Sequence, residues 1–112
     1  ARELGLRQIL RHIEEAPLFP SAPVIFSGDF NCHPDSEELR VFDEFPEYTS
    51  VARDIGVTYH GYGRFQDPGK PIDFIYLRGG LACRRVQRWQ DCEKGVWLSD
   101  HYPVCAVLEL VS

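Results

Sequence analysis

The stretch Val24–Ser36, with the sequence VIFSGDFNCHPDS, decides the fold, because a buried strand ends in it and polar side chains follow at once. Its first three residues form a short apolar run with β-branched side chains, which is typical of a strand buried on both faces. Gly28 marks the end of that run, and Asp29 and Asn31 follow two residues apart. In extended backbone their side chains point to one side of the strand. The alternative is a local Asx-turn.

Two later places in the chain repeat the pattern of an acid beside large apolar residues. Asp73 stands in the sequence IDF at the start of an apolar run, and Asp100 stands in SDHY, directly before His101. Burial of a lone carboxylate is costly unless the group is paired or bound to a metal. We therefore expect Asp29, Asp73, Asp100 and His101 to converge on one cation-binding hollow at the rim of a sheet.

Two helices are predicted around these places. Apolar residues at i, i+3, i+4 and i+7 predict a helix over residues 1–15, whose apolar face consists of Leu6, Ile9, Leu10 and Ile13. Pro17 and Pro20 are expected to end it. A capping-box pattern, with Asp35 or Ser36 as the N-cap and Glu38 as its partner, predicts a second, short helix over residues 36–44.

Three further strands are predicted after an irregular segment over residues 47–71, in which residues 57–59 are a candidate small strand. Residues 72–77 form a strong strand signal, Gly79 and Gly80 predict a turn, and residues 81–89 are the expected hairpin partner. A loop over residues 90–98 leads to a final strand over residues 102–110. The order predicts one α/β (α+β) domain over residues 1–112, and it leaves open whether the first strand pairs in parallel or antiparallel fashion.

Composition and charge limit the class of protein. The chain has 112 residues and a formal net charge of −5, which argues against binding nucleic acid mainly by phosphate neutralisation. No run approaches the roughly 20 apolar residues that cross a bilayer, and no signal peptide opens the chain. The four cysteines form no CxxC pair and are expected to be reduced, mostly buried thiols, which favours a cytoplasmic location. The helical pattern begins at Ala1 without an N-cap, as in a piece of something longer.

The motifs GDFN, PIDFIY and SDHYPV occur in this order between residues 24 and 108. Together they resemble the carboxyl-terminal half of the endonuclease/exonuclease/phosphatase superfamily, which includes deoxyribonuclease I, inositol polyphosphate phosphatases and sphingomyelinases. The resemblance implies half of a four-layer α/β/β/α sandwich, with a mixed sheet and flanking helices. It also implies a divalent-metal-dependent phosphoesterase that uses Mg²⁺ or Mn²⁺ and an activated water to hydrolyse a phosphodiester or phosphomonoester.

The resemblance assigns a role to each motif residue. Asp29 orients or deprotonates the attacking water and touches the metal, and Asn31 holds a phosphate oxygen or that water. Asp100 is a metal-site carboxylate, His101 hydrogen-bonds the phosphate, and Asp73 orients the histidine ring and keeps it protonated. Elementary chemistry agrees, because a nearby acid raises a histidine pKa and carboxylate oxygens suit Mg²⁺. The alternatives of a structural edge histidine and a structural Asp73 stay open.

In the resembled superfamily, the amino-terminal half of the domain supplies an Asn, a metal-binding Glu and often a His or Tyr. Nothing before Val24 matches those motifs, and Glu14 and Glu15 do not replace them. We therefore expect weak or no activity from this chain alone. An apolar sheet face is expected to be exposed, and to drive self-association or to bind a complementing amino-terminal half.

The segment Thr58–Arg64, with the sequence TYHGYGR, resembles a segment of bacterial branches of the superfamily. It predicts that His60 and Arg64 line a pocket for a phosphate-ester substrate, with a surface loop as the alternative. A second basic segment reads either as a nucleic-acid strip or, more simply, as a solvated strand edge, and consists of Arg84, Arg85, Arg88 and Trp89. A small molecule or lipid headgroup is therefore favoured over nucleic acid as the substrate.

Two functions of other classes remain open. The first is a non-catalytic binding or self-associating module derived from the same fold. The second is a thiol- or zinc-dependent protein that uses Cys32, His33 and Cys92, although their spacing gives it little support.

Overall fold

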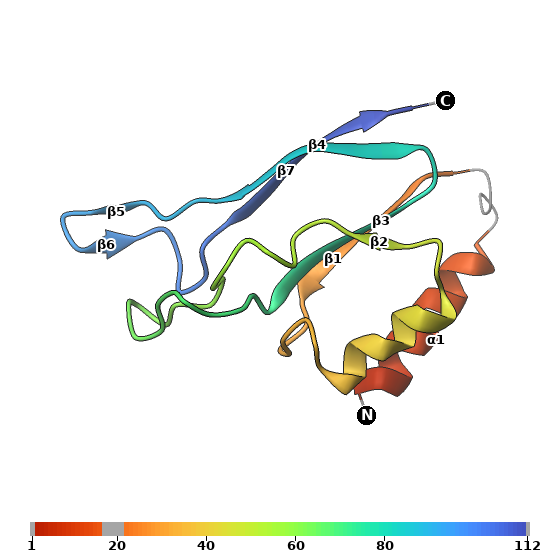
Figure 1. The fold of residues 1–112 in the computed structure, drawn as a ribbon, viewed down its shortest axis with the longest axis horizontal. Coiled ribbons are helices and arrows are strands. Elements are labelled where there is room, and N and C mark those ends of the chain that lie inside the picture. Colours follow the sequence, from red (N-terminus) through yellow and green to blue (C-terminus); the bar gives the residue numbers. More distant parts are fainter. Residues whose placement is uncertain (1, 17–21, 112) are drawn as a thin grey trace.

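The computed structural model describes residues 2–16 and 22–111 (Figure 1). Within them the chain forms one α-helix, one 3-10 helix and seven short strands. In chain order these are α1 (Arg2–Glu14), β1 (Val24–Asp29), η1 (Glu37–Glu44), β2 (Thr49–Ser50), β3 (Asp73–Arg78), β4 (Leu81–Arg88), β5 (Cys92–Glu93), β6 (Val96–Trp97) and β7 (Val104–Leu110). The α+β class expected from the sequence is confirmed.

Strands β1, β3 and β2 form one sheet with β3 in the middle. β1 pairs with β3 over its whole length and places Asp29 directly opposite Asp73 at the end of the ladder. β2 pairs only with the other end of β3, where Thr49 lies opposite Leu77. All pairings between the described strands are antiparallel, which settles the direction of the first strand. Within this part of the chain the expected mixed sheet is not seen.

The molecule is layered, with both helices on one side of this sheet and the β4–β7 ribbon on the other side (Figure 1). The core lies between the helices and the sheet, where Leu10 of α1 is fully buried. Aromatic rings fill most of it. Tyr76 of β3 stacks on Phe42 of η1 with ring centroids 3.7 Å apart, and Phe30 lies parallel to Tyr76 at 6.1 Å. Burial of these large rings attaches the helices to the sheet.

The two predicted helices are present, but the buried face of the first and the type and cap of the second differ from the prediction. Leu10 is buried and Leu6 and Ile13 pack against the core, but Ile9 is 49% exposed. Ala1, Pro17 and Pro20 lie outside the described residues, and α1 ends at Glu14, one residue before the predicted end. The second helix is a 3-10 helix, and the predicted capping box does not form in it. Ser36 stands at the N-cap in extended backbone without a side-chain cap hydrogen bond.

The predicted hairpin between residues 72–77 and 81–89 is wrong. β4 pairs with β7 instead, so Gly79 and Gly80 carry the chain from the sheet to a separate two-stranded ribbon. Gly79 has a φ of 93°, and a Cβ at this position would approach the Cα of Pro23 to 3.0 Å. The turn is therefore restricted to glycine by its backbone and by its neighbour. Sequence pattern alone identified both strands but not their partners.

Two smaller elements also differ from expectation. Residues 57–59 form no strand, and only Tyr59 makes an isolated antiparallel bridge, to His101. The expected loop over residues 90–98 contains the β5–β6 hairpin. Its turn has Lys94 and Gly95 at φ values of 54° and 77°, the backbone of a tight two-residue hairpin turn.

An ion pair fastens the irregular segment to β4. The Arg88 guanidinium pairs with the Asp67 carboxylate and donates to the Val57 carbonyl at 2.6 Å. Asp67 also accepts the Val57 N–H at 3.0 Å. The hydrogen bond from Arg88, followed by the one from Val57, lowers the pKa of Asp67 below its ordinary value. Only 13% of the Arg88 side chain is exposed, so Arg88 does not belong to a solvated or nucleic-acid-binding strip.

We expect Asp67→Asn to lower the stability of the protein by about 1 kcal/mol at neutral pH, since water still reaches this carboxylate. Because the folded-state pKa is lowered, the stabilisation is present above the unfolded value of about 3.9 and is lost as pH falls through the lower folded value. Urea unfolding at neutral and acidic pH measures this difference. Asp91→Asn, at an exposed acid between β4 and β5, is the control, and equal losses in both variants would contradict the prediction.

None of the helices in the described residues is long and apolar enough to cross a membrane. The cysteines are all free thiols, but only Cys32 is buried, while Cys92 is exposed and Cys83 and Cys105 are half-buried. The expectation of mostly buried thiols is therefore corrected.

Candidate active site

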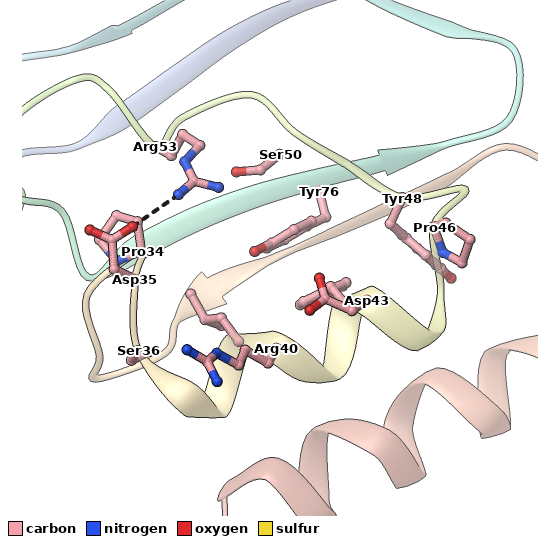
Figure 2. Close-up of a pocket in the computed structure, with 12 residues that line it drawn as sticks. Pro34, Asp35, Ser36, Arg40, Asp43, Pro46, Tyr48, Ser50, Arg53 and Tyr76 are labelled. Carbon is pink, nitrogen blue, oxygen red and sulfur yellow. Dashed lines mark hydrogen bonds and ion pairs between the residues drawn. The ribbon is translucent and has the colours of Figure 1, made fainter.

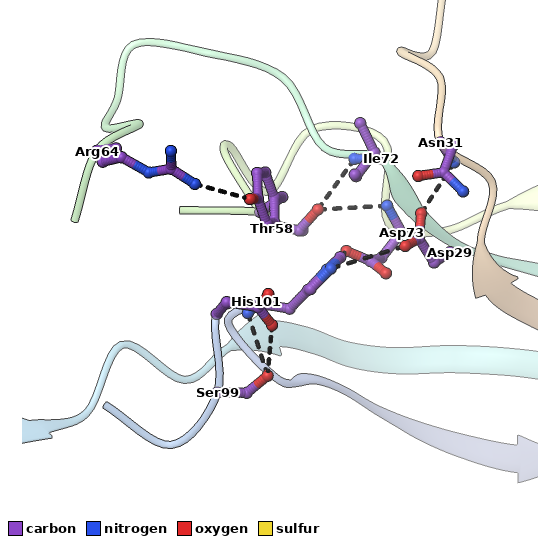
Figure 3. A network of polar contacts seen from close by, with 10 residues as sticks. Asp29, Asn31, Thr58, Arg64, Ile72, Asp73, Ser99 and His101 are labelled. Atoms are coloured by element: carbon purple, nitrogen blue, oxygen red, sulfur yellow. Dashed lines mark hydrogen bonds and ion pairs between the residues drawn. The ribbon is translucent and has the colours of Figure 1, made fainter. Parts of the chain in front are cut away.

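Three of the predicted side chains meet at one end of the sheet (Figure 3). Asp29 ends β1, Asp73 begins β3, and His101 lies just before β7. One ligand atom of each lies within 4.8 Å of the others. Residues separated by up to 72 positions in the chain are thus gathered at one place, as the sequence predicted for them.

The imidazole of His101 bridges the two carboxylates. Its Nδ1 lies 2.8 Å from Asp73 Oδ2, and its Nε2 lies 3.6 Å from Asp29 Oδ2. Burial of the ring opposes protonation, but the hydrogen bond to Asp73 and the charges of Asp73, Asp29 and Asp100 outweigh it. The pKa of His101 is therefore raised above its ordinary value. A protonated imidazole can donate to an anion from a half-buried position.

The strand register explains why the two acids are so close. Asp29 and Asp73 are directly opposite in the antiparallel ladder, which places their side chains on the same face of the sheet. Like charges in such a pair repel one another. His101 offsets this repulsion when it is protonated, since its two ring nitrogens face the two carboxylates.

Asn31 is placed by a turn and not by the strand. Its φ of 54° takes it out of extended backbone, and its backbone N–H donates to Asp29 Oδ1 at 2.9 Å. The Asx-turn is therefore confirmed, and Asn31 does not continue the extended backbone of Asp29. The turn keeps the asparagine beside the acid and uses one carboxylate oxygen of Asp29 (Figure 3).

Asp100 reaches the site mainly through its backbone and its charge. Its carbonyl accepts the N–H groups of His60 and Gly61 at 3.0 and 3.1 Å. Its carboxylate oxygen Oδ1 accepts the Ser99 hydroxyl at 3.2 Å, and the same hydroxyl accepts the His101 N–H at 3.2 Å. Among the described residues its carboxylate is not part of the converging group of Asp29, Asp73 and His101.

His60 is in the core, which corrects its predicted contact with a substrate. The side chain is 1% exposed, and its ring lies 4.4 Å from Tyr102 and 4.5 Å from Trp97 between centroids. Its Nδ1 accepts the Gly63 N–H at 3.2 Å. A ring without exposed surface cannot reach a ligand, so in this structure His60 shapes the loop at residues 61–64.

Arg64 lies at the edge of the site, one contact away from His101. Its guanidinium donates to the Gly61 carbonyl at 3.0 Å and to the Tyr59 hydroxyl at 3.2 Å. The Tyr59 ring lies 5.1 Å from the His101 ring between centroids. Arg64 remains exposed, and its predicted role in substrate binding stays a prediction.

Sequence reasoning missed Thr58 and Ser99. Thr58 is completely buried, and its Oγ1 accepts the N–H groups of Ile72 at 2.9 Å and Asp73 at 3.2 Å. In the sequence, Thr58 stands out only as the first residue of the TYHGYGR segment. A buried hydroxyl that serves the backbone far along the chain leaves no periodic signal in the sequence.

The converging side chains open onto a small cavity. A volume of about 280 Å³ lies along Asp29, Asp73 and His101 and continues past Tyr102 and Pro103. Such a volume is close to the lower end of ligand pockets, roughly 300–1,000 Å³. The polar groups stand at its wall, so a phosphate-sized group can meet both the imidazole and Asp29.

A larger cavity of about 630 Å³ lies elsewhere, between η1 and the β2–β3 side of the sheet (Figure 2). Its lining includes Arg40, Asp43 and Arg53, and Arg53 already pairs with Asp35 at 3.4 Å. None of the converging acids or His101 lines it. The larger of these two cavities therefore lacks the converging acids and the histidine. We place the candidate site at the smaller cavity, because Asp29, Asp73 and His101 line it.

The donor set of the site fits a hard divalent cation in part. Asp29 offers a carboxylate oxygen, which Mg²⁺ and Mn²⁺ accept, whereas the Asp100 carboxylate lies outside the converging group of the described residues. Asp73 is engaged with His101 at 2.8 Å and serves the histidine. In residues 2–16 and 22–111 no cluster of cysteine and histidine ligands is found, so the zinc hypothesis built on Cys32 gains no support.

The family follows from a comparison with protein-family models. The model of the endonuclease/exonuclease/phosphatase family matches residues 1–101. The chain belongs to this family. Comparison with the curated proteins gives no match.

Solved structures of the same fold match nearly the whole chain. A family protein from Bacteroides vulgatus has a TM-score of 0.79 at 24% identity, over 97% of this chain and 44% of its own. A mannosyl-6-phosphatase from Bacteroides thetaiotaomicron has a TM-score of 0.85 at 18% identity, over 97% and 46%. A conserved protein of unknown function from Enterococcus faecalis has a TM-score of 0.77 at 21% identity, over 98% and 44%. This chain spans less than half the length of each of these structures.

Proposed function

We propose that the protein carrying this chain is a divalent-metal-dependent phosphoesterase that hydrolyses its substrate with an activated water. The observation that supports this most directly is the convergence of Asp29, Asp73 and His101 within 4.8 Å at the mouth of a cavity. Membership in a family of nucleases and phosphatases supports a phosphate ester as the substrate class.

The chemistry divides among four side chains. Asp29 accepts a proton from the attacking water or orients it, because its Oδ2 lies 3.6 Å from His101 Nε2 and both residues line the cavity. His101 donates from Nε2 to a phosphate oxygen and stabilises the negative charge that develops there. Asp73 holds Nδ1 at 2.8 Å and keeps the imidazole protonated. Asn31 donates to a phosphate oxygen or to the water.

Asp29 and Asp100 are the proposed carboxylate ligands of Mg²⁺ or Mn²⁺. Such an ion, when bound, neutralises phosphate charge and helps to activate the water. Two carboxylates with waters and substrate oxygens are a usual ligand set for Mg²⁺. Further ligands are expected from the part of the domain that the longer relatives have and this chain lacks.

For the substrate we propose a small phosphate ester in place of long nucleic acid. The net charge of −5 does not favour a polyanion. Two basic side chains of the β4 segment are engaged, since Arg84 pairs with Glu109 and Arg88 pairs with Asp67. One matching structure is named a mannosyl-6-phosphatase, which makes a sugar phosphate a reasonable first substrate to test.

Metal depletion tests the proposal. We expect the protein carrying this chain to hydrolyse a sugar 6-phosphate or an aryl phosphodiester, to stop after treatment with EDTA, and to recover with Mg²⁺ or Mn²⁺. Zn²⁺ and Ca²⁺ serve as comparison ions, and a short duplex DNA is the comparison substrate. Turnover that survives EDTA, or the absence of turnover with every ester and ion, would contradict the proposal.

A second candidate function is a non-catalytic, self-associating module. It is favoured by apolar side chains that are more than half exposed on two strands, namely Ile25 at 57%, Val107 at 51% and Leu110 at 74%. We propose that a complementing half-domain or a second copy covers them. Sedimentation of the 112-residue chain alone should then show association. A clean monomer would contradict the covered surface, and association without turnover in the presence of the complementing half would favour the module.

A further inference from the structure

Thr58 lies where the first residues of β3 lack a strand neighbour. β2 pairs with β3 only at Tyr76 and Leu77, and the Val51 N–H then donates to the Ile75 carbonyl. Beyond that point no described strand lies beside β3 on the side away from β1. The Thr58 hydroxyl takes that place, because its Oγ1 accepts the N–H of Ile72, directly before β3, at 2.9 Å and the N–H of Asp73, the first residue of β3, at 3.2 Å.

The same short segment holds His101 from the other side. The Thr58 carbonyl accepts the Tyr102 N–H at 2.7 Å, and Tyr59 forms an antiparallel bridge with His101. The Tyr59 and His101 rings lie 5.1 Å apart between centroids. The dipeptide Thr58–Tyr59 therefore touches the backbone of Asp73 and the backbone on both sides of the His101–Tyr102 bond. Figure 3 shows the Thr58 hydroxyl beside Ile72 and Asp73.

We propose that Thr58 is a positioning residue for the Asp73–His101 pair. Its hydroxyl uses both acceptor lone pairs on the β3 backbone. This fixes the origin of the Asp73 side chain, whose Oδ2 must meet His101 Nδ1 at 2.8 Å. Thr58 is completely buried and does not face the cavity, so it acts through Asp73 and not on the substrate. The expected effect of Thr58 on turnover rests on the proposed function. The placement of Asp73 against His101 by Thr58 does not depend on that function.

Thr58→Val keeps the shape of the side chain and removes the acceptor oxygen. Two backbone N–H groups then lose their partner, and the start of β3 is expected to shift. Misplacement of a reacting group by about 1 Å can cost about 100-fold in rate. We therefore expect kcat to fall by about 10- to 100-fold with little change in KM, because the substrate contacts themselves remain. Thr58→Ser keeps the oxygen and is expected to restore kcat.

The experiment uses the protein carrying this chain and two readouts. The first is kcat and KM on the phosphate ester that gives turnover. The second is the downfield proton NMR signal of the hydrogen-bonded His101 Nδ1–H without substrate, identified by its loss in His101→Gln. Thr49→Val is the matched exchange on exposed β2, and Val41→Ala is a core truncation in η1 that lowers stability away from the site.

Loss or displacement of the NMR signal in Thr58→Val, with retention in Thr58→Ser and Val41→Ala, is the expected result. If Thr58→Val behaves like Val41→Ala in kcat and in the signal, Thr58 is merely structural and the proposal is overturned. If Thr58→Val does not fold, Thr58→Cys takes its place, because a thiol is a weaker acceptor than a hydroxyl. Full kcat and an unchanged NMR signal in Thr58→Cys would then overturn the proposal. If no phosphate ester is turned over by the unmodified protein, the proposed function fails, and the NMR signal alone still decides the geometry.

Discussion

Asp29→Asn is expected to reduce kcat by about 1,000-fold, within the range of about 10²–10⁴ that general base catalysis contributes. The amide cannot accept the proton of the attacking water and is a poorer ligand for Mg²⁺ than a carboxylate. Its oxygen can still accept the Asn31 N–H, which Asp29 now binds at 2.9 Å, so the turn after β1 is expected to survive. The loss should therefore appear in turnover and not in folding.

Steady-state kinetics at saturating Mg²⁺ or Mn²⁺ measure this loss, together with thermal unfolding as a check on the fold. Asp43→Asn is the matched control, since Asp43 is an exposed acid on η1 and lines the separate cavity of Figure 2. It should keep the turnover of the unmodified protein. Turnover within a few-fold of normal in Asp29→Asn would exclude Asp29 as the group that activates the attacking water and would contradict the proposed division of roles.

The sequence predicts the end of the sheet well because its signals are local. Gly28 and Asp29 close an apolar run, and Asp73 opens another. Once the two runs pair in antiparallel fashion, the register places Asp29 opposite Asp73. The meeting with His101 could be expected from the cost of leaving acids unpaired in apolar surroundings. The expected convergence needs only the residue types and their order, whereas the antiparallel pairing of β1 with β3 is a finding of the structure.

What the sequence could not predict depends on partners far along the chain. Residues 81–89 follow a turn signal and therefore look like a hairpin partner of β3, but β4 pairs with β7. A strand signal in the sequence does not identify the neighbouring strand. His60 looks like a ligand by type and is buried by contacts with Trp97 and Tyr102. Thr58 serves a strand that begins 15 residues later. Ile9 belongs to the apolar helical stripe but is 49% exposed, because the stripe does not show which of its residues the sheet covers.

His101→Gln is expected to reduce kcat by about 100- to 1,000-fold, the usual loss when one charge-stabilising donor of a transition state is removed. Glutamine can donate to a phosphate oxygen but carries no positive charge. Glutamine therefore no longer offsets the repulsion between Asp29 and Asp73. In the unmodified protein, Asp29 lies 3.6 Å from His101 Nε2 and Asp73 lies 2.8 Å from His101 Nδ1. KM for a phosphate ester is expected to rise as well. His12→Gln on α1, far along the chain from the site motifs, is the control and should keep both constants.

The same variant changes the pH dependence of stability in the metal-free protein. The pKa of His101 is raised in the folded state, so its contribution to stability is fully present below the unfolded value of about 6.5. That contribution is lost as pH rises through the raised folded value. Thermal unfolding between mildly acidic and mildly alkaline pH should show this decline in the unmodified protein, whereas His101→Gln should lack it. Identical pH profiles in the two proteins would mean that the imidazole carries no charge between the carboxylates, and the phosphate-stabilising role would have to be given to another cation.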